Sequence, residues 1–276
     1  MQPADIARAT DATVATVAAA GLPADDAVVV HNSNKLALRV LPGDVFARVA
    51  HVGQEVAQFE VELAGRLTAV EAPIAQLDPR VAPRVYECDG FAITLWTYYE
   101  TTAELSAARY AAALEQLHAG MRTVELPSPH FTDRVAEAQA IVANNGDPNH
   151  ALIRDALRDA GKVISEIAFT EQLLHGEPHP GNLLGTESGP RFIDLESCCR
   201  GPVEFDLAHV PAAVSECYPN ANDELLRACR HLVLAMVAAW RCEPGDDLPN
   251  RERAFQNLLD ALRAGAPWPT LDVVSP

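Results

Sequence analysis

The stretch from residue 175 to residue 206 limits the possible folds of this chain more than any other part of its sequence. It begins with the run HGEPHPGN, whose last residue is Asn182. A Ser-Gly-Pro turn at residues 188–190 follows, and after it come the apolar pair Phe192-Ile193 and then Asp194. Because turn residues between apolar runs are typical of a hairpin, the sequence predicts a strand, a hairpin and a second strand, with a carboxamide and a carboxylate at the mouth of the hairpin.

The spacing within this stretch resembles the catalytic loop of kinases. In that loop a histidine opens the turn, an acidic residue two places on orients the attacking hydroxyl, and an asparagine five places further holds a magnesium ion. The corresponding residues here are His175, Glu177 and Asn182. A second magnesium ligand should follow on the next strand, and Asp194 has that place.

The whole stretch resembles the aminoglycoside phosphotransferase and choline kinase family. The family's loop is usually written HGDxHxxN, and it is followed by IDxE or IDxD and then by a G-x-x-x-x-DLA segment. This chain supplies Ile193-Asp194-Leu195-Glu196, then Gly201-Pro202, then Asp206-Leu207-Ala208 in the same order. The departure is Glu177, where the family most often has Asp. A carboxylate remains at this place, one methylene further from the backbone.

The resemblance implies an α+β, protein-kinase-like fold with a small N-terminal antiparallel-sheet lobe and a larger, mainly helical C-terminal lobe. A chain of 276 residues exceeds the usual size of one domain, which agrees with two lobes around a cleft. We expect the nucleotide-binding lobe at residues 1–95, a hinge at 96–100, and the catalytic and acceptor-binding lobe at 101–276. The composition changes near the hinge from strand-like to helical and alanine-rich.

Local patterns agree with this division. Alternating apolar residues between Ala27 and Ala50, interrupted by the polar loop 31–34 and by a Pro-Gly-Asp turn, predict a three-stranded antiparallel meander. A helix should follow from about residue 54 to residue 67. The other expected elements are a short N-terminal helix, strands at 84–88 and 91–96, a helix opened by a capping box at Thr101 and Glu104 and ending near His118, and helices at 147–167, 222–241 and 250–264.

The resemblance also implies a cation over the nucleotide phosphates and an acid that holds the cation. Arg48 is the candidate cation, because it lies on the second strand of a predicted hairpin where the family usually has Lys or Arg. Glu60 on the following helix is the candidate acid, and Glu62 is the competing choice. Both Arg48 and Glu60 are also compatible with a solvated surface.

Other contacts to the nucleotide are expected from a loop and from the hinge. The loop from His31 to Lys35 should lie over the phosphates, where Ser33 and Asn34 could donate hydrogen bonds; it contains no glycine, so it is not a Walker loop. Trp96 and Tyr98 are the expected hinge residues that receive the adenine ring. Without a role in nucleotide binding, the loop would be an ordinary polar turn, and the segment with Trp96 and Tyr98 would be an apolar core strand.

In the catalytic loop the resemblance implies that Glu177 accepts or orients the hydroxyl proton, while Asn182 and Asp194 bind Mg²⁺ that bridges the phosphates. His175 and Asp206 are expected to hydrogen-bond to the loop backbone. Two residues have open roles. Glu196 could touch the metal or line the acceptor site, and His179 could be a loop-packing residue.

Three other interpretations of the loop compete with a kinase active site. A His-x-Glu sequence also begins the zinc deaminase signature, but that motif needs a Pro-Cys-x-x-Cys that the adjacent Cys198 and Cys199 do not supply. A zinc site made by His175, Glu177 and His179 would leave Asn182 without purpose. A degenerate kinase fold that binds nucleotide or a partner without phosphate transfer is the more serious alternative.

Charge and composition limit the classes of molecule that the protein is expected to bind and the compartment in which it is expected to occur. The formal net charge of −17 repels nucleic acid and favours a cationic small molecule. No C-x-x-C pair occurs among the six cysteines, and no run of eighteen apolar residues occurs, so a reducing cytoplasm without membrane insertion is expected. The oligomeric state stays undetermined.

We therefore expect a phosphotransferase (kinase) that moves the γ-phosphate of ATP or GTP to a hydroxyl of a small cationic acceptor. An aminoglycoside or another basic antibiotic is the first choice, because the strongly negative charge favours a basic acceptor. The abundance of alanine and arginine with few lysines suggests a GC-rich bacterial genome, which is compatible with antibiotic resistance. A metabolite kinase for choline, homoserine or a related amino alcohol is the alternative.

Overall fold

The computed structural model describes residues 1–276 except 34, 54–55, 103–104, 144–145, 244–249 and 275–276. The chain divides into two compact units, which are described separately below. The first consists of Met1–Glu104 and Leu184–Glu196, and the second of Leu105–Leu183 and Ser197–Pro276. Residues 184–196, which we expected in the helical lobe, therefore group with the first unit. The hinge at residues 96–100 stays a prediction.

The first unit is built on a five-stranded antiparallel sheet with the order β1-β2-β3-β5-β4. The strands are β1 (Ala24–Asn32), β2 (Leu36–Pro42), β3 (Val45–His51), β4 (Tyr86–Cys88) and β5 (Phe91–Thr97). The predicted meander is confirmed as β1, β2 and β3. His31 and Asn32, expected in a loop, pair with β2 instead, so the connection is shorter than predicted.

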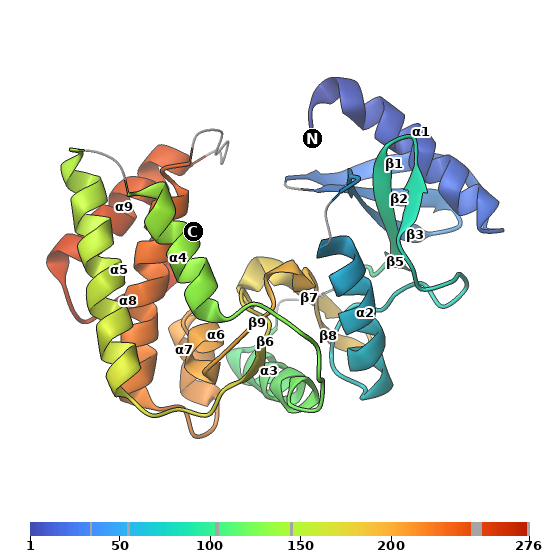
Figure 1. The fold of residues 1–276 in the computed structure, drawn as a ribbon. Coiled ribbons are helices and arrows are strands. Elements are labelled where there is room, and N and C mark those ends of the chain that lie inside the picture. The colour runs from blue at the N-terminus through green and yellow to red at the C-terminus, as the bar shows by residue number, and fades with distance from the viewer. Residues whose placement is uncertain (34, 54–55, 103–104, 144–145, 244–249, 275–276) are drawn as a thin grey trace. The chain divides into compact units, whose positions relative to one another are not determined.

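Strand alternation sorts the residues of this sheet onto two faces. Val45, Ala47 and Val49 on β3 are fully buried, and they pack with the apolar residues of β2 against helix α1 (Pro3–Ala19) on one face of the sheet (Figure 1). Because successive side chains of a strand point to opposite faces, Arg48 projects from the other face. The same face is where the charged cluster described below is found.

Helix α2 (Val56–Ala69) and a short hairpin complete the first unit. The hairpin consists of β7 (Leu183–Thr186) and β8 (Gly189–Phe192), which pair with each other as predicted. Two backbone hydrogen bonds of 2.8 Å fix β8, one from Phe192 N to Pro73 O and one from Ala75 N to Phe192 O. The segment that carries Asp194 is thereby held within the first unit.

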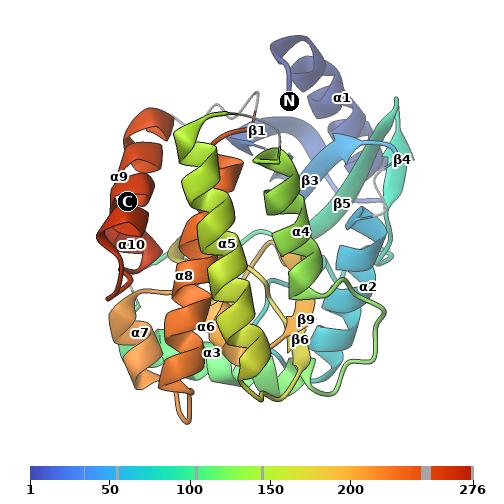
Figure 2. The same cartoon turned by 60° about the vertical axis from the view of Figure 1, so that its left-hand side comes forward.

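The second unit is mainly helical. Its helices are α3 (Ala107–Met121), α4 (Phe131–Ile141), α5 (Pro148–Glu166), α6 (Val203–Leu207), α7 (Ala212–Cys217), α8 (Asp223–Trp240), α9 (Arg251–Ala264) and α10 (Leu271–Val274). A short antiparallel pair joins β6 (Gln172–Leu174) to β9 (Cys199–Gly201). Helices α5 and α8 lie side by side in both views (Figures 1 and 2). Nearly every apolar side chain of α8 is buried, so this helix forms the centre of the unit.

Capping residues explain where two helices begin. Asp147 caps α5 as predicted, because its side chain accepts a 2.8 Å hydrogen bond from Asn149 N and Pro148 follows at the first helical position. The predicted start of α3 at Thr101 is wrong. Ser106 is the N-cap there, since its hydroxyl accepts from Arg109 N; Glu104 lies outside the described residues. None of the described helices is both long and apolar enough to span a bilayer.

The core of the first unit gives a stability prediction. Ile93 is fully buried in β5, where it pairs with β3 on one side and β4 on the other. Ile93→Ala should lower the free energy of unfolding by about 2–5 kcal/mol, because it leaves a cavity in a packed sheet. Val30→Ala on the edge strand β1, where the side chain is 52% exposed, is the control and should cost less than about 0.5 kcal/mol. Urea unfolding measures both, and equal losses would contradict this assignment of the core.

Candidate active site

Five charged side chains from separate segments of the first unit meet in one cluster. Arg48 of β3 donates from Nη1 to Glu60 Oε1 of α2 at 2.6 Å, and from Nη2 to Asp194 Oδ1 at 2.7 Å. Lys35, just before β2, contacts Glu60 Oε2 at 2.5 Å and Glu196 Oε2 at 2.6 Å. Each cation therefore bridges Glu60 and one of the two acids that follow the hairpin.

The expected pair of Arg48 and Glu60 is thus present. Its competitor Glu62 lies on the outer face of α2, where it pairs with Arg66. Sequence reasoning gave no role to Lys35, although the residue ends the loop expected over the phosphates. A signal was available, because Lys35 is one of only two lysines in the chain and immediately precedes a strand.

Burial makes the electrostatics of this cluster strong. Burial raises the pKa of the Glu60 carboxyl, and the charges of Arg48 and Lys35 oppose this rise. Burial likewise disfavours the charged guanidinium of Arg48, but Glu60 and Asp194 outweigh it and raise the pKa of Arg48. With all groups ionised, three carboxylates face two cations, so one negative charge is in excess.

The excess charge lies where the cluster opens to solvent. The side chains of Asp194 and Glu196 are 32% and 23% exposed, whereas that of Glu60 is 2% exposed. Asp194 also has a backbone φ of 64°, a left-handed conformation that is rare for a residue with a Cβ and is common at functional sites. Two partly exposed carboxylates in a cluster with one excess negative charge are suited to binding an additional cation.

The other residues that are expected to contact the nucleotide lie in different surroundings. Ser33 is exposed and its backbone N–H donates to Lys35 O at 3.2 Å, while Asn34 lies outside the described residues. Trp96 is a buried residue of β5 whose indole N–H donates to Thr94 Oγ1 at 2.8 Å. Tyr98 follows the end of β5, and its ring lies under the guanidinium of Arg39, 3.9 Å from the ring centroid. Their contact with a nucleotide stays a prediction.

In the second unit, a fully buried carboxylate organises the HGEPHPGN loop. Asp206 accepts hydrogen bonds from His175 N at 2.9 Å and from Gly176 N at 2.8 Å, and it contacts His118 Nε2 at 2.9 Å. His118 in turn contacts the hydroxyl of Tyr218 at 2.8 Å. Asp206 thus makes the backbone hydrogen bonds that its expected role requires.

The loop also depends on the glycine at position 176. Gly176 has a φ of 88°, and a Cβ at this position would lie 1.9 Å from Ser197 O. The close approach of these two backbone segments therefore leaves no room for a side chain. This contact explains the glycine of the motif on steric grounds.

The carboxylate of Glu177 is engaged by Arg134 of α4 in a partly buried ion pair. Burial alone would raise the pKa of the Glu177 carboxyl, but the charge of Arg134 outweighs it and lowers the pKa below its usual value. Burial lowers the pKa of the neighbouring His209 imidazole to about 4, so that ring is neutral at pH 7. No pattern in the sequence pointed to Arg134, because α4 was not among the predicted elements.

The second half of the loop is fixed by short-range contacts. Asn182 Nδ2 donates to Glu177 O at 3.0 Å, which leaves the amide oxygen of Asn182 as its acceptor atom. His179 Nδ1 accepts from Gly181 N at 3.1 Å and caps the short 3₁₀ helix at Pro180–Asn182. Tyr110 OH donates to Pro178 O. His179 therefore has a structural contact within the loop.

The residues are compatible with a hard divalent cation. Mg²⁺ prefers oxygen ligands, and the carboxylates of Asp194 and Glu196 in the first unit are of this kind. Among the residues that the structure describes, no group of three His, Cys, Asp or Glu side chains is arranged to hold a metal ion by itself. The alternative zinc site of His175, Glu177 and His179 therefore lacks the required ligand cluster.

The buried Asp206 gives a prediction about acid stability. Burial disfavours its carboxylate, but hydrogen bonding and charge from His118 outweigh burial and lower the pKa of Asp206. A group with a lowered folded-state pKa stabilises the fold above its unfolded pKa near 3.9, and this contribution is lost as the pH falls through the folded value. Replacing Asp206 by Ala at pH 7 should cost about 3–5 kcal/mol, because buried donors lose their partner.

The measurement is urea unfolding of wild type, Asp206→Ala and Asp206→Asn between about pH 7 and pH 3, a range that spans the ordinary pKa of Asp. The wild type should lose more stability than Asp206→Asn at the acid end. Asp155→Asn, on the exposed face of α5, is the control and should follow the wild type. Parallel curves for wild type and Asp206→Asn would contradict the prediction.

Known proteins are similar to this chain over most of its length. The model of the phosphotransferase enzyme family APH matches residues 28–268. The structure of the amicoumacin kinase hAmiN in complex with AMP-PNP, Ca²⁺ and Ami is similar, with a TM-score of 0.72 and 9% identity over 99% of this chain and 100% of that one. Comparison with curated proteins gives no match.

Two further structures are similar over most of their length. The choline kinase LicA from Streptococcus pneumoniae has a TM-score of 0.70 and 14% identity, over 92% of this chain and 98% of that one. The spectinomycin phosphotransferase APH(9)-Ia, in complex with ADP and spectinomycin, has a TM-score of 0.65 and 15% identity, over 96% and 97%. The fold is therefore protein-kinase-like, as predicted, and because the family model matches most of its length, this chain belongs to the APH phosphotransferase enzyme family.

Proposed function

We propose that this protein transfers the γ-phosphate of ATP or GTP to a hydroxyl group of a small molecule, with Mg²⁺ as the metal. The observation that carries this proposal is the cluster in which Arg48 contacts both Glu60 and Asp194. A phosphoryl transferase needs a cation held by an acid beside a metal-binding carboxylate, and these residues come from three separate segments to provide that arrangement.

The cations of the cluster are assigned to the phosphates. Arg48 presents five N–H donors on a planar guanidinium, and Lys35 supplies a compact ammonium, so together they can neutralise several phosphate oxygens. Glu60 contacts both cations and orients them. Ser33 and Asn34 are also assigned to the phosphates, whereas Trp96 and Tyr98 are assigned to the hinge that receives the base.

Asn182 and Asp194 are the proposed metal ligands, and Glu196 is placed beside Asp194 through its contact with Lys35. A bound Mg²⁺ supplies charge neutralisation for the phosphate oxygens. Once nucleotide phosphates engage Arg48 and Lys35, the oxygens of Asp194 and Glu196 that these cations contact become available as ligands.

Glu177 is the residue assigned to the acceptor hydroxyl. Its carboxylate orients the hydroxyl and takes its proton as the new O–P bond forms and the bond to the nucleoside diphosphate breaks. The contacts of Asp206 with the loop and of Asn182 with Glu177 O hold the backbone of this residue in place. Positioning, rather than covalent chemistry, is what the loop contributes.

A cationic acceptor is supported by the net charge of −17, which attracts basic molecules by long-range electrostatics. Similar structures include kinases named for amicoumacin, spectinomycin and choline, so both a basic antibiotic and an amino alcohol belong to the acceptor panel. A cytoplasmic location, where nucleotide triphosphates are abundant, is part of the same proposal.

The second candidate is a protein that binds nucleotide without transferring phosphate. It is favoured by one observation, because the carboxylate of Glu177 is engaged by Arg134 rather than open on both oxygens. Nucleotide binding without turnover on any acceptor would select this candidate.

Replacing Asp194 by Asn should reduce turnover by about 100-fold or more, because the carboxylate that binds the metal and pairs with Arg48 is lost. The assay mixes magnesium nucleotide with a panel of amino alcohols and basic antibiotics, and it measures nucleotide consumption and product mass. Asp89→Asn, which removes an exposed partner of Arg8 in the same unit, is the matched control. Full activity of the Asp194 variant would refute the assignment.

Replacing Lys35 by Met should weaken nucleotide binding by about tenfold, or ~1.4 kcal/mol, because one phosphate-binding cation is lost and Glu60 keeps only one partner. Calorimetric titration with the magnesium nucleotide measures the dissociation constant. Arg66→Met on the outer face of α2 removes a cation of the same unit without touching the cluster and should bind like wild type. Unchanged affinity in the Lys35 variant would show that Lys35 is only a structural partner of Glu60.

A further inference from the structure

Arg134 approaches Glu177 from a distant part of the sequence. It lies on α4, and its Nη2 pairs with Glu177 Oε1 while its Nη1 donates to Ser197 O at 3.3 Å. The guanidinium carbon is also 5.1 Å from the ring centroid of Trp240 at the end of α8. Three elements of the second unit thus define the position of this one side chain.

These contacts restrict the guanidinium in different ways. The hydrogen bond to Ser197 O and the ion pair use two donors of one rigid plane, and the indole of Trp240 provides a face for the cation. The side chains of Arg134 and Glu177 are only 15% and 25% exposed, so water screens their attraction less than at the surface. A guanidinium that is restrained in this way can hold a flexible carboxylate in one conformation.

The side chain of Glu177 needs such a restraint because it is longer than that of an aspartate. A glutamate has one more side-chain torsion than an aspartate and loses more conformational freedom when it is ordered. The hydrogen bond from Asn182 fixes only the backbone carbonyl of Glu177. Among the described residues, Arg134 engages Oε1 of Glu177, and Oε2 is the oxygen left for an acceptor hydroxyl.

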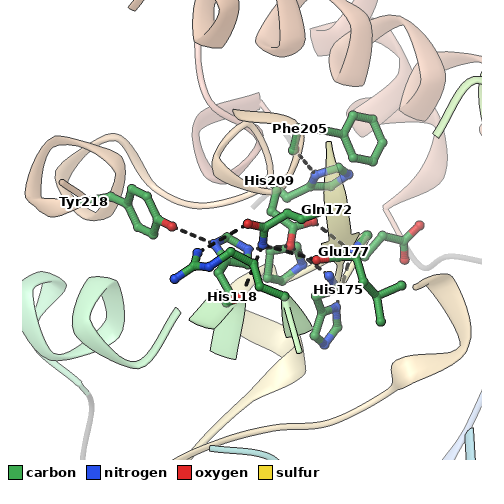
Figure 3. A network of polar contacts seen from close by, with 12 residues as sticks. His118, Gln172, His175, Glu177, Phe205, His209 and Tyr218 are labelled. Atoms are coloured by element: carbon green, nitrogen blue, oxygen red, sulfur yellow. Dashed lines mark hydrogen bonds and ion pairs between the residues drawn. The ribbon is translucent and has the colours of Figure 1, made fainter. Parts of the chain in front are cut away.

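The charges around Glu177 make Arg134 its principal partner. His209, which follows α6, is buried and neutral at pH 7, and its Nδ1 contacts Phe205 O at 2.9 Å (Figure 3). His179 belongs to the same loop and caps the 3₁₀ turn. Arg134 is therefore the permanently charged group in direct contact with the carboxylate.

We propose that Arg134 is a positioning residue for the acceptor-activating carboxylate, which it holds in one conformation with Oε2 available. The role rests on the proposed function of Glu177 in phosphate transfer. In the reaction, the proton passes from the acceptor hydroxyl to Glu177, the hydroxyl oxygen forms a bond to the γ-phosphorus, and the nucleoside diphosphate leaves. Arg134 stays charged throughout and contacts neither substrate.

The test is a cycle of variants at the two positions. Arg134→Gln removes the charge, Arg134→Lys keeps it without the planar pair of donors, and each is made in the wild type and in Glu177→Asp. In the Asp background the carboxylate is one methylene closer to the backbone, away from Arg134. Arg154→Gln is the matched control, because Arg154 is half-buried on α5 and donates to Val142 O.

In the wild-type background, Arg134→Gln should lower kcat by about 10-fold to 100-fold, because a misplaced catalytic group loses rate steeply. The KM for nucleotide should change by less than about twofold, since Arg134 is not assigned to the nucleotide. Arg134→Lys should recover part of kcat. In the Glu177→Asp background, Arg134→Gln should cost less than about threefold, because the interaction that it removes is already absent.

Urea unfolding of every variant accompanies the assay, so that rates are compared among folded proteins. If Arg134→Gln does not fold, the same comparison is made with Arg134→Lys, whose smaller loss should again vanish in the Asp background. Equal losses in both backgrounds would show that Arg134 supports only the fold, and a gain in kcat would show that it restrains Glu177 from reacting; either result overturns the proposal.

Wild-type turnover distinguishes a failure of the proposed function from a failure of the role proposed for Arg134. If the wild type consumes no nucleotide with any acceptor of the panel, the proposed function fails and the role of Arg134 fails with it. If the wild type is active, as expected, and Arg154→Gln is equally active, the comparison of the two backgrounds decides the role of Arg134 alone.

Discussion

The arrangement of the candidate site depends on Glu60, a nearly fully buried carboxylate that contacts two cations at once. Burying an acid is costly unless it is paired, and here each oxygen of Glu60 has its own cation, Lys35 or Arg48. Both cations then reach outward to the acids after the hairpin, Glu196 and Asp194. One buried charge on α2 is therefore linked through two cations to the carboxylates of Asp194 and Glu196.

The second unit uses the same physical solution for its loop. Asp206 is fully buried, and the backbone N–H groups of His175 and Gly176, together with His118, satisfy its carboxylate. Glu177 next to this anchor is partly exposed and pairs with Arg134. In both units a fully buried acid gives rigidity, while a partly exposed acid is available for chemistry, which is how groups of one type can have different roles.

Much of this was predictable from local sequence. The spacing of the HGEPHPGN loop identified the family, alternation predicted the meander, turn residues predicted the hairpin, and Asp147 marked the start of α5. The predicted start of α3 was wrong, because a local signal competed with a tertiary contact. Thr101 and Glu104 have the form of a capping box, yet Thr102 N donates to Gly185 O of the hairpin, and the helix begins only after Ser106. Tertiary hydrogen bonding outweighed the local signal.

The sequence by itself determined the family, the two-part α+β architecture and the identity of the candidate catalytic acids, because these depend on short motifs and on the periodicity of neighbouring residues. Only the tertiary structure decided that Lys35 shares Glu60 with Arg48, and that Arg134 engages Glu177. Arg48 and Asp194 are 146 residues apart, and Arg134 and Glu177 are 43 apart. No local pattern encodes which buried charges meet at such separations, because the pairing is decided by the packing of whole elements and by the cost of leaving a charge unpaired.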